Sequence, residues 1–387
     1  MQSCYSNYIS RMKPYILVVS LVLLLACRDK SARTSANQPL SNEELFDTYR
    51  KSVVLIQNKS YYRIRFAGGV RMYCTEINSN GHMYLSENED RIRKEAEINY
   101  GTGFFVNERG VIATNLHVLA PIDRLLEEMD FKNSVSRALK NWSENEDRKL
   151  SVAAHRLAKT VKHDSLPGRA VSSTHLDTSR HKHFEPHFNG YKFDSVNRLK
   201  VSVDSILSQA RLVKALLTQD FTIELMTADL DIYLDGATSN EDAYACRVIA
   251  LSQDKNIDLA LIQTAGHEVP EEAGPIAEPI YLFDTIKVTT PLYLIGYNYG
   301  PEIAKTAAGL KVQFTRGEVS QESDQYRVLY TIPALTGSSG SPVFDQFGRL
   351  VAINYKGYNT KENFNYGIHA GQLRKLLRSE KKLSLPL

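Results

Sequence analysis

The amino-acid sequence predicts a mainly β fold that is interrupted by a helical insertion. Two observations lead to this expectation. Short stretches with strand-like alternation, separated by turn residues, occupy 51–114 and 221–368, and many short strands of this kind are typical of a barrel or a sandwich. Between them, from 121 to about 217, apolar residues recur instead at helical spacing. A short amphipathic helix at 372–378 closes the pattern.

The composition is that of an ordinary globular protein. Hydrophobic residues make up 43% of the chain and charged residues 24%, which is enough apolar material to form a core. The net charge of +3 is small for 387 residues. A nucleic-acid partner would need a concentrated basic surface, so none is expected. The 21 tyrosines favour sheet over helix.

The first 27 residues have the pattern of an export signal. Arg11 and Lys13 precede an apolar run at 15–26, which is shorter than a comfortable membrane span. We expect a signal peptide over 1–27 that is removed; an uncleaved N-terminal anchor is the alternative. Residues 24–27, Leu-Leu-Ala-Cys, resemble a bacterial lipoprotein processing site. The resemblance implies that Cys27 carries lipid and that the mature protein is anchored to a membrane of the cell envelope, facing the periplasm or the surface.

The rest of the chain divides into a tether and one interrupted domain. Residues 28–40 are polar and have the composition of a flexible tether. Ser41 with Glu44 three residues later is a capping-box pattern that starts a short helix. We expect a domain over 41–380, interrupted by the mainly helical residues 121–225. Cys74 and Cys246 remain outside the signal segment, and their spacing fits either one disulfide or two free thiols.

A stretch near the C-terminus has the features of a nucleophile turn. Residues 336–344, Thr-Gly-Ser-Ser-Gly-Ser-Pro-Val-Phe, place Ser339 between Gly337 and Gly340. A serine hydroxyl is a weak nucleophile that needs a neighbouring base and backbone N–H groups aimed at the developing oxyanion. A tight turn flanked by glycines supplies such groups. A plain glycine–serine turn is the alternative when the stretch is taken alone.

Two further stretches carry a base and an acidic partner. Residues 101–117 have a hairpin pattern that ends in His117, and Asp258 opens an alternating strand at 258–264. Taken singly, a histidine at a strand end and an aspartate at a strand start are common. Together with Ser339 they occur in the order His, Asp, Ser, which is one of the recurrent orders of a catalytic triad.

With these motifs the sequence resembles the chymotrypsin-like (trypsin-like) serine proteases of bacteria. Residues 101–119 are similar to the histidine motif of the high-temperature-requirement (HtrA) proteases, and residues 337–344 to the serine motif of the glutamyl endopeptidases. The resemblance covers roughly 45–120 and 228–378. It implies a chymotrypsin-like double six-stranded β-barrel. It also implies a serine endopeptidase that cleaves exported or extracellular proteins through an acyl-enzyme, with no cofactor and no metal.

The resemblance gives each matching residue a role. Ser339 would be the nucleophile, His117 the general base and then the acid, and Asp258 the group that holds the histidine tautomer. The N–H groups of Gly337 and Ser339 would form the oxyanion hole. The implied substrate-binding residues are Tyr355, Lys356 and Gly357 on the strand that pairs with substrate, Gly357 and Gly367 beside the specificity pocket, and Pro333 near its base.

The chain departs from these relatives at several positions. Ser338 stands where trypsin-like zymogens have an aspartate that receives a new N-terminus, so we expect activity without N-terminal cleavage. Asn354 stands where glutamyl endopeptidases have a histidine that binds an acidic side chain, which argues against acidic specificity. His369 either approaches the pocket from its back strand or packs inside the fold. We expect no PDZ domain after residue 371, in contrast to typical HtrA proteases.

The insertion at 121–225 lies between the histidine and aspartate stretches, so we expect a lid over the cleft or a docking surface for a protein partner. It contains a polar cluster formed by His175, Asp177, His181, His183, Glu185 and His187. These side chains can bind Zn²⁺, but a polar loop is the simpler interpretation and no metal site is assigned. The alternative to an endopeptidase is a catalytically silent binding or regulatory lipoprotein on a protease fold. The sequence leaves the substrate, the residue preference and the oligomeric state open.

Overall fold

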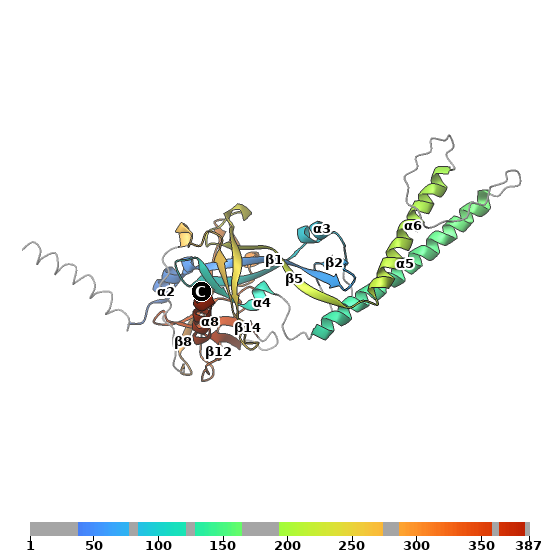
Figure 1. The fold of residues 1–387 in the computed structure, drawn as a ribbon. Coiled ribbons are helices and arrows are strands. Elements are labelled where there is room, and N and C mark those ends of the chain that lie inside the picture. The colour runs from blue at the N-terminus through green and yellow to red at the C-terminus, as the bar shows by residue number, and fades with distance from the viewer. Residues whose placement is uncertain are drawn as a thin grey trace, which may run out of the picture. The chain divides into compact units, whose positions relative to one another are not determined.

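The computed structural model describes residues 38–76, 84–120, 128–164, 193–273, 286–357 and 364–383 (Figure 1). The chain divides into two compact units, one formed by 1–59, 98–122 and 229–387 and the other by 60–97 and 123–228. Divisions fall within β1 (Val53–Phe66) and β5 (Phe221–Tyr233) and after the first residue of β3 (Glu97–Phe105). The signal segment with Cys27, most of the tether and the polar cluster at 175–187 lie outside the described residues.

The first sheet contains seven strands in the order β2-β1-β3-β4-β7-β6-β5, and a further pairing of β1 with β5 closes six of them into a barrel. The remaining strands of this sheet are β2 (Arg71–Cys74), β3 (Glu97–Phe105), β4 (Val111–Thr114), β6 (Tyr244–Leu251) and β7 (Ala260–Thr264). β-Branched and other apolar side chains, which favour strands, pack together among them. The completely buried members include Val54, Ile56, Ile112, Ile232 and Ile262.

The second sheet contains six antiparallel strands in the order β11-β8-β13-β14-β15-β12. They are β8 (Pro291–Gly296), β11 (Gln313–Glu318), β12 (Arg327–Tyr330), β13 (Pro342–Asp345), β14 (Leu350–Gly357) and β15 (Asn365–His369). The two end strands approach each other where Val319, just after β11, bridges to Tyr330 of β12. The core of this sheet includes Leu292, Leu294, Val328, Val343 and Val351, all completely buried.

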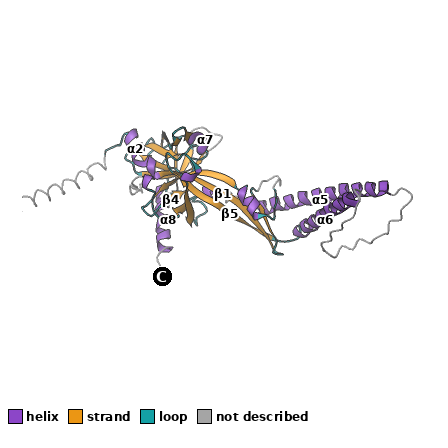
Figure 2. Cartoon of the chain, turned by 90° about the horizontal axis from the view of Figure 1, so that it is seen from above, coloured by secondary structure: helices purple, strands orange, loops and turns teal. Residues whose placement is uncertain are grey.

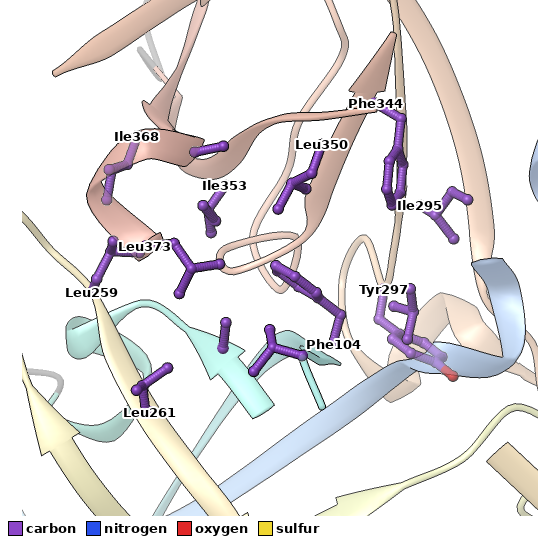
Figure 3. Packing of buried hydrophobic residues seen from close by; sticks show 14 of the residues in the cluster. Phe104, Leu259, Leu261, Ile295, Tyr297, Phe344, Leu350, Ile353, Ile368 and Leu373 are labelled. Carbon is purple, nitrogen blue, oxygen red and sulfur yellow. The ribbon is translucent and has the colours of Figure 1, made fainter. Parts of the chain in front are cut away.

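One continuous apolar core joins the two sheets in the first unit (Figure 3). Phe104 and Leu261 come from the first sheet and Leu259 lies just before its strand β7, whereas the second sheet contributes Ile295, Phe344, Leu350, Ile353 and Ile368. Leu373 and Leu376 of the C-terminal helix α8 (Ala370–Leu383) also pack into it. The expected mainly β, chymotrypsin-like double barrel with a C-terminal helix is therefore confirmed.

Short helices and turns complete the first unit. They are α2 (Asn42–Tyr49), α4 (Leu116–Leu119) and α7 (Pro301–Ala304), with a small hairpin of β9 (Lys305–Thr306) and β10 (Gly309–Leu310). The expected capping box is present at α2, because Ser41 Oγ accepts from Glu44 N and Glu44 Oε2 accepts from Ser41 N. The helix is held to the second sheet by a hydrogen bond from the Tyr49 hydroxyl to Gly348 O.

The second unit contains the helices of the insertion. α5 (Glu128–Asp164) and α6 (Phe193–Leu216) lie side by side (Figure 2), and α3 (Glu89–Lys94) precedes them in the chain. Val135, Leu139 and Val213, which the helical spacing singled out, are buried. None of the described helices is both long and apolar enough to cross a membrane. The bounds 121–225 of the insertion stay a prediction. The last five residues of that range belong to β5, which begins at Phe221.

Pairing between distant segments sets the length of the first strand, and the structure also resolves the state of the two cysteines. β1 continues to Phe66 because its second half pairs with β2 in the register Tyr62 to Cys74. Cys74 and Cys246 are both free thiols in the structure. Burial raises the pKa of each thiol to about 12, so both stay protonated and unreactive at neutral pH.

Candidate active site

His117 lies on α4, the short helix that follows the end of β4. Two hydrogen bonds from the entry to this helix reach the same acceptor, because Leu116 N and Asn115 Nδ2 both donate to the carbonyl oxygen of Asp258. On the other side, Asn99 Nδ2 donates to the carbonyl oxygen of His117 over 3.2 Å. The backbone around His117 is therefore tied to β3 through Asn99 and to Asp258 just before β7, which fixes the point from which the histidine side chain extends.

Asp258, just before β7, engages His117 with both carboxylate oxygens. Oδ1 accepts from the backbone N–H of His117 over 2.9 Å, and Oδ2 is hydrogen-bonded to the ring Nδ1 of the same residue. A carboxylate can only accept, so Nδ1 carries the proton. The other ring nitrogen, Nε2, is then left as the basic one. The Asp258 side chain is 17% exposed and that of His117 37% exposed, so the base faces solvent while its partner is covered.

Ser339 lies in the turn between Gly337 and Gly340, and it is half-buried. The turn requires glycines because φ is +90° at Gly337 and +88° at Gly340, which side chains rarely adopt. A Cβ at Gly340 would also lie 2.0 Å from the carbonyl oxygen of Thr102. The backbone of the turn therefore passes closer to β3 than any other residue type would allow.

Thr102, on β3, ties the serine turn to the first barrel. Its backbone N–H donates to Ser339 O over 2.8 Å, and its hydroxyl donates to Gly337 O over 2.8 Å. Thr102 is completely buried, and its own carbonyl accepts from the hydroxyl of Thr114 at the end of β4. The strand that leads to His117 and the turn that carries Ser339 are thus linked through one buried threonine.

The direction of the Gly337 N–H follows from the carbonyl that precedes it. Tyr299 N donates to Thr336 O, and in a planar trans peptide the C=O of Thr336 and the N–H of Gly337 point in opposite directions. The hydrogen bond therefore turns the Gly337 N–H away from Tyr299. Tyr299 itself has φ +58°, an uncommon conformation for a tyrosine that is typical of functional sites.

The expected substrate-binding residues lie on β14 and β15 of the second sheet, except for Pro333, which follows β12. Lys356 and Gly357, on β14, pair with Tyr366 and Asn365 on β15, after an irregularity in the register at 354–356. The Tyr355 ring lies beside His117, with 6.4 Å between the ring centroids. Gly367 is enclosed, because a Cβ there would lie 3.0 Å from the Tyr330 hydroxyl, whereas Pro333 is exposed.

Asn354 and His369, which the sequence analysis placed near the specificity pocket, are buried and form hydrogen bonds inside the fold. Asn354 is 2% exposed, and its amide bonds to Ser338 and Tyr330. His369 is 4% exposed, and its Nδ1 accepts from Gly371 N. Burial lowers the pKa of His369, so the ring is a neutral packing residue. Of the two alternatives for His369, the structure has the packed one.

Sequence reasoning missed three residues of this region. Thr102 lies within the glycine-flanked stretch 101–103 of the histidine motif, so its position could have drawn attention. Asn115 also lies in that motif, but its contact with Asp258 joins segments that are 143 residues apart and is not visible in the sequence. Tyr330 lies in none of the motifs, and its contact with Asn354 joins segments that are 24 residues apart. In the described ranges, no group of His, Cys, Asp or Glu side chains is arranged to hold a metal ion.

Three comparisons with known proteins were made, and one of them matches the region of Asp258 and Ser339. A family model described as a trypsin-like peptidase domain matches residues 222–353, which include Asp258 and Ser339. Among solved structures, the serine endoprotease from Yersinia pestis is similar, with a TM-score of 0.41 and 12% identity over 89% of this chain and 68% of that one. No curated protein that was compared matches the chain.

The family match and the two barrels define the class of protein. They confirm the resemblance to chymotrypsin-like serine proteases that the motifs indicated. Over residues 222–353 the chain is similar to trypsin-like peptidases, which supports a protease that acts on protein or peptide substrates.

Proposed function

We propose that this protein is a serine endopeptidase in which Ser339, His117 and Asp258 form the catalytic triad. The observation that carries the proposal is the double engagement of His117 by Asp258, which leaves Nε2 as the ring nitrogen that can accept a proton. The glycine-flanked turn of Ser339, tied through Thr102 to the strand before His117, supports it.

The first half of the reaction forms an acyl-enzyme. Ser339 Oγ attacks the carbonyl carbon of the scissile peptide while His117 Nε2 takes the hydroxyl proton. Asp258 stabilises the imidazolium that results, because both of its oxygens already face donors of His117. The N–H groups of Gly337 and Ser339 donate to the oxyanion. Collapse of the tetrahedral intermediate breaks the C–N bond, and His117 gives its proton to the leaving amine.

The second half releases the acyl group. Water attacks the ester carbonyl of Ser339 while His117 Nε2 accepts one of its protons, and the same oxyanion donors are used again. Breakdown of the second intermediate returns the proton to Ser339 Oγ and frees the new carboxylate. Tyr355 and its neighbours on β14 are proposed to pair with the substrate backbone as an added strand.

The place of action is proposed to be the cell envelope. The positive start, the apolar run at 15–26 and the Leu-Leu-Ala-Cys sequence support export and lipid attachment at Cys27. The substrates would then be exported or extracellular proteins. The helices of the 121–225 segment are proposed to cover the cleft or to recruit a protein partner.

Hydrolysis of unfolded casein by the chain from residue 28 onward tests the function and its independence from N-terminal processing. We expect cleavage at internal peptide bonds without any prior trimming, because Ser338 offers no carboxylate to a new N-terminus. The N-terminal segment is instead held elsewhere, by a hydrogen bond from Leu40 N to Gln346 O. Mass spectrometry of the enzyme before and after the reaction checks that its N-terminus is unchanged. Activity that appears only after the first residues are removed would contradict this proposal.

A further inference from the structure

A chain of hydrogen bonds through three buried side chains lies behind the nucleophile turn. The Tyr330 hydroxyl donates to Asn354 Oδ1 over 2.8 Å, and Asn354 Nδ2 donates to Ser338 O over 2.9 Å and to Ser338 Oγ over 3.0 Å. The Ser338 hydroxyl in turn donates to Leu335 O over 2.6 Å. Tyr330, Asn354 and Ser338 are 0%, 2% and 1% exposed, so water does not compete for these bonds.

Which atoms can donate and which can only accept sets the direction of each hydrogen bond in this network. Ser338 O can only accept, so the amide nitrogen of Asn354 must face it and the amide oxygen must face Tyr330. Burial raises the pKa of Tyr330, so its hydroxyl keeps the proton that Asn354 Oδ1 requires. The amide nitrogen thus donates to both oxygens of Ser338, and the amide oxygen accepts from Tyr330. A buried side chain with all its polar atoms paired has one stable orientation.

The bond to Ser338 O also sets the direction of an N–H group next to it. The C=O of Ser338 and the N–H of Ser339 belong to one planar trans peptide, so they point in opposite directions. Asn354 Nδ2 and the backbone N–H of Ser341 both donate to this carbonyl. While it is held in this way, the Ser339 N–H must point away from these two donors. The strand that carries Asn354 also holds the turn directly, because Gly340 N donates to Asn354 O over 2.8 Å.

We propose that Tyr330 and Asn354 are positioning residues that aim the Ser339 N–H into the oxyanion hole. The inference rests on the proposed function, since it assigns a partner to a group of the same site. The bonds from Asn354 to Ser338 would keep the turn in shape without the salt bridge that a new N-terminus forms with an aspartate at this position in trypsin-like zymogens. Tyr299 has the equivalent effect on the Gly337 N–H through Thr336 O. The carbonyl group before each proposed oxyanion donor therefore accepts a hydrogen bond that fixes its direction: Thr336 O from Tyr299, and Ser338 O from Asn354.

The test is the rate of fluorophosphonate labelling of the full chain in detergent, expressed per folded molecule. The phosphonyl oxygen develops charge in the oxyanion hole, so a misdirected N–H slows the reaction. We expect Asn354→Ala to lower the second-order rate constant about a hundredfold, near the effect of losing one oxyanion donor. Tyr330→Phe keeps the ring and removes one neutral hydrogen bond, and we expect a decrease of about tenfold. The pH midpoint of the labelling rate should not move, because the His117–Asp258 pair is untouched.

Tyr297→Phe is the matched control. Tyr297 is as deeply buried as Tyr330, but its hydroxyl has no hydrogen-bond partner in the described part of the chain. This variant should label at the wild-type rate. Melting temperature and circular dichroism give the folded fraction of each variant. If Asn354→Ala and Tyr330→Phe lower only the folded fraction and label at the wild-type rate per folded molecule, the inference is overturned and the network is merely structural. A wild-type chain that does not label would overturn the proposed function and, with it, this inference.

Discussion

Replacement of Ser339 by alanine is expected to lower kcat for peptide hydrolysis about a millionfold, with little change in KM. The variant lacks the oxygen that forms the acyl-enzyme, and triad serines contribute an effect of this size because the three residues act as a unit. The turn itself should persist, since its shape depends on the glycines and on backbone bonds to Thr102. Initial rates on a fluorogenic peptide, measured at several enzyme concentrations, give the two constants.

Ser341→Ala serves as the control for this substitution. Ser341 lies two residues further along the same segment and is completely buried, and its hydroxyl has no hydrogen-bond partner among the residues that the structure describes. We expect this variant to keep the wild-type kcat. Equal activity of the Ser339→Ala variant and the wild type would show that the hydrolysis comes from another group or from a contaminant.

Replacement of Asp258 by asparagine is expected to lower kcat about ten-thousandfold. Both oxygens of Asp258 accept from His117, one from the backbone N–H and one from the ring at Nδ1. An asparagine has a single acceptor oxygen. If that oxygen keeps the backbone bond, the amide N–H₂ faces the ring and forces the proton from Nδ1 to Nε2. Nε2 can then no longer take the proton of Ser339.

The same kinetic assay tests this prediction, with KM as the internal control. The substitution preserves the shape of the side chain and touches no proposed substrate-binding residue, so KM should stay within about threefold of the wild type. A kcat within tenfold of the wild type would contradict the role of Asp258 and would require another partner for His117.

The sequence predicted those parts of the fold that depend on local patterns. Alternating strands, the capping box at Ser41 and the helical spacing of Val135 and Leu139 are properties of neighbouring residues, and all are found in the structure. The extent of β1 was not predictable in this way. Its second half is a strand because β2 pairs with it, and such pairing depends on residues that are distant along the chain.

The candidate site shows the same limit. Its three proposed catalytic residues were recognised because each lies in a motif, and the contact of His117 with Asp258 then follows from the barrel that brings β4 beside β7. The support behind the site was not recognised. Asn354 seemed to be a pocket residue by its position in the sequence, but its amide is used by Ser338 and Tyr330. No local pattern shows which polar atoms a buried amide will meet.

The most direct test of the central claim, that His117 activates Ser339, is fluorophosphonate labelling of the chain from residue 28 onward beside the His117→Ala and Ser339→Ala variants. The account predicts that the wild type is labelled, that peptide mapping places the label on Ser339, and that both variants lose it. Absence of labelling in the wild type, or labelling that persists without His117, would contradict it.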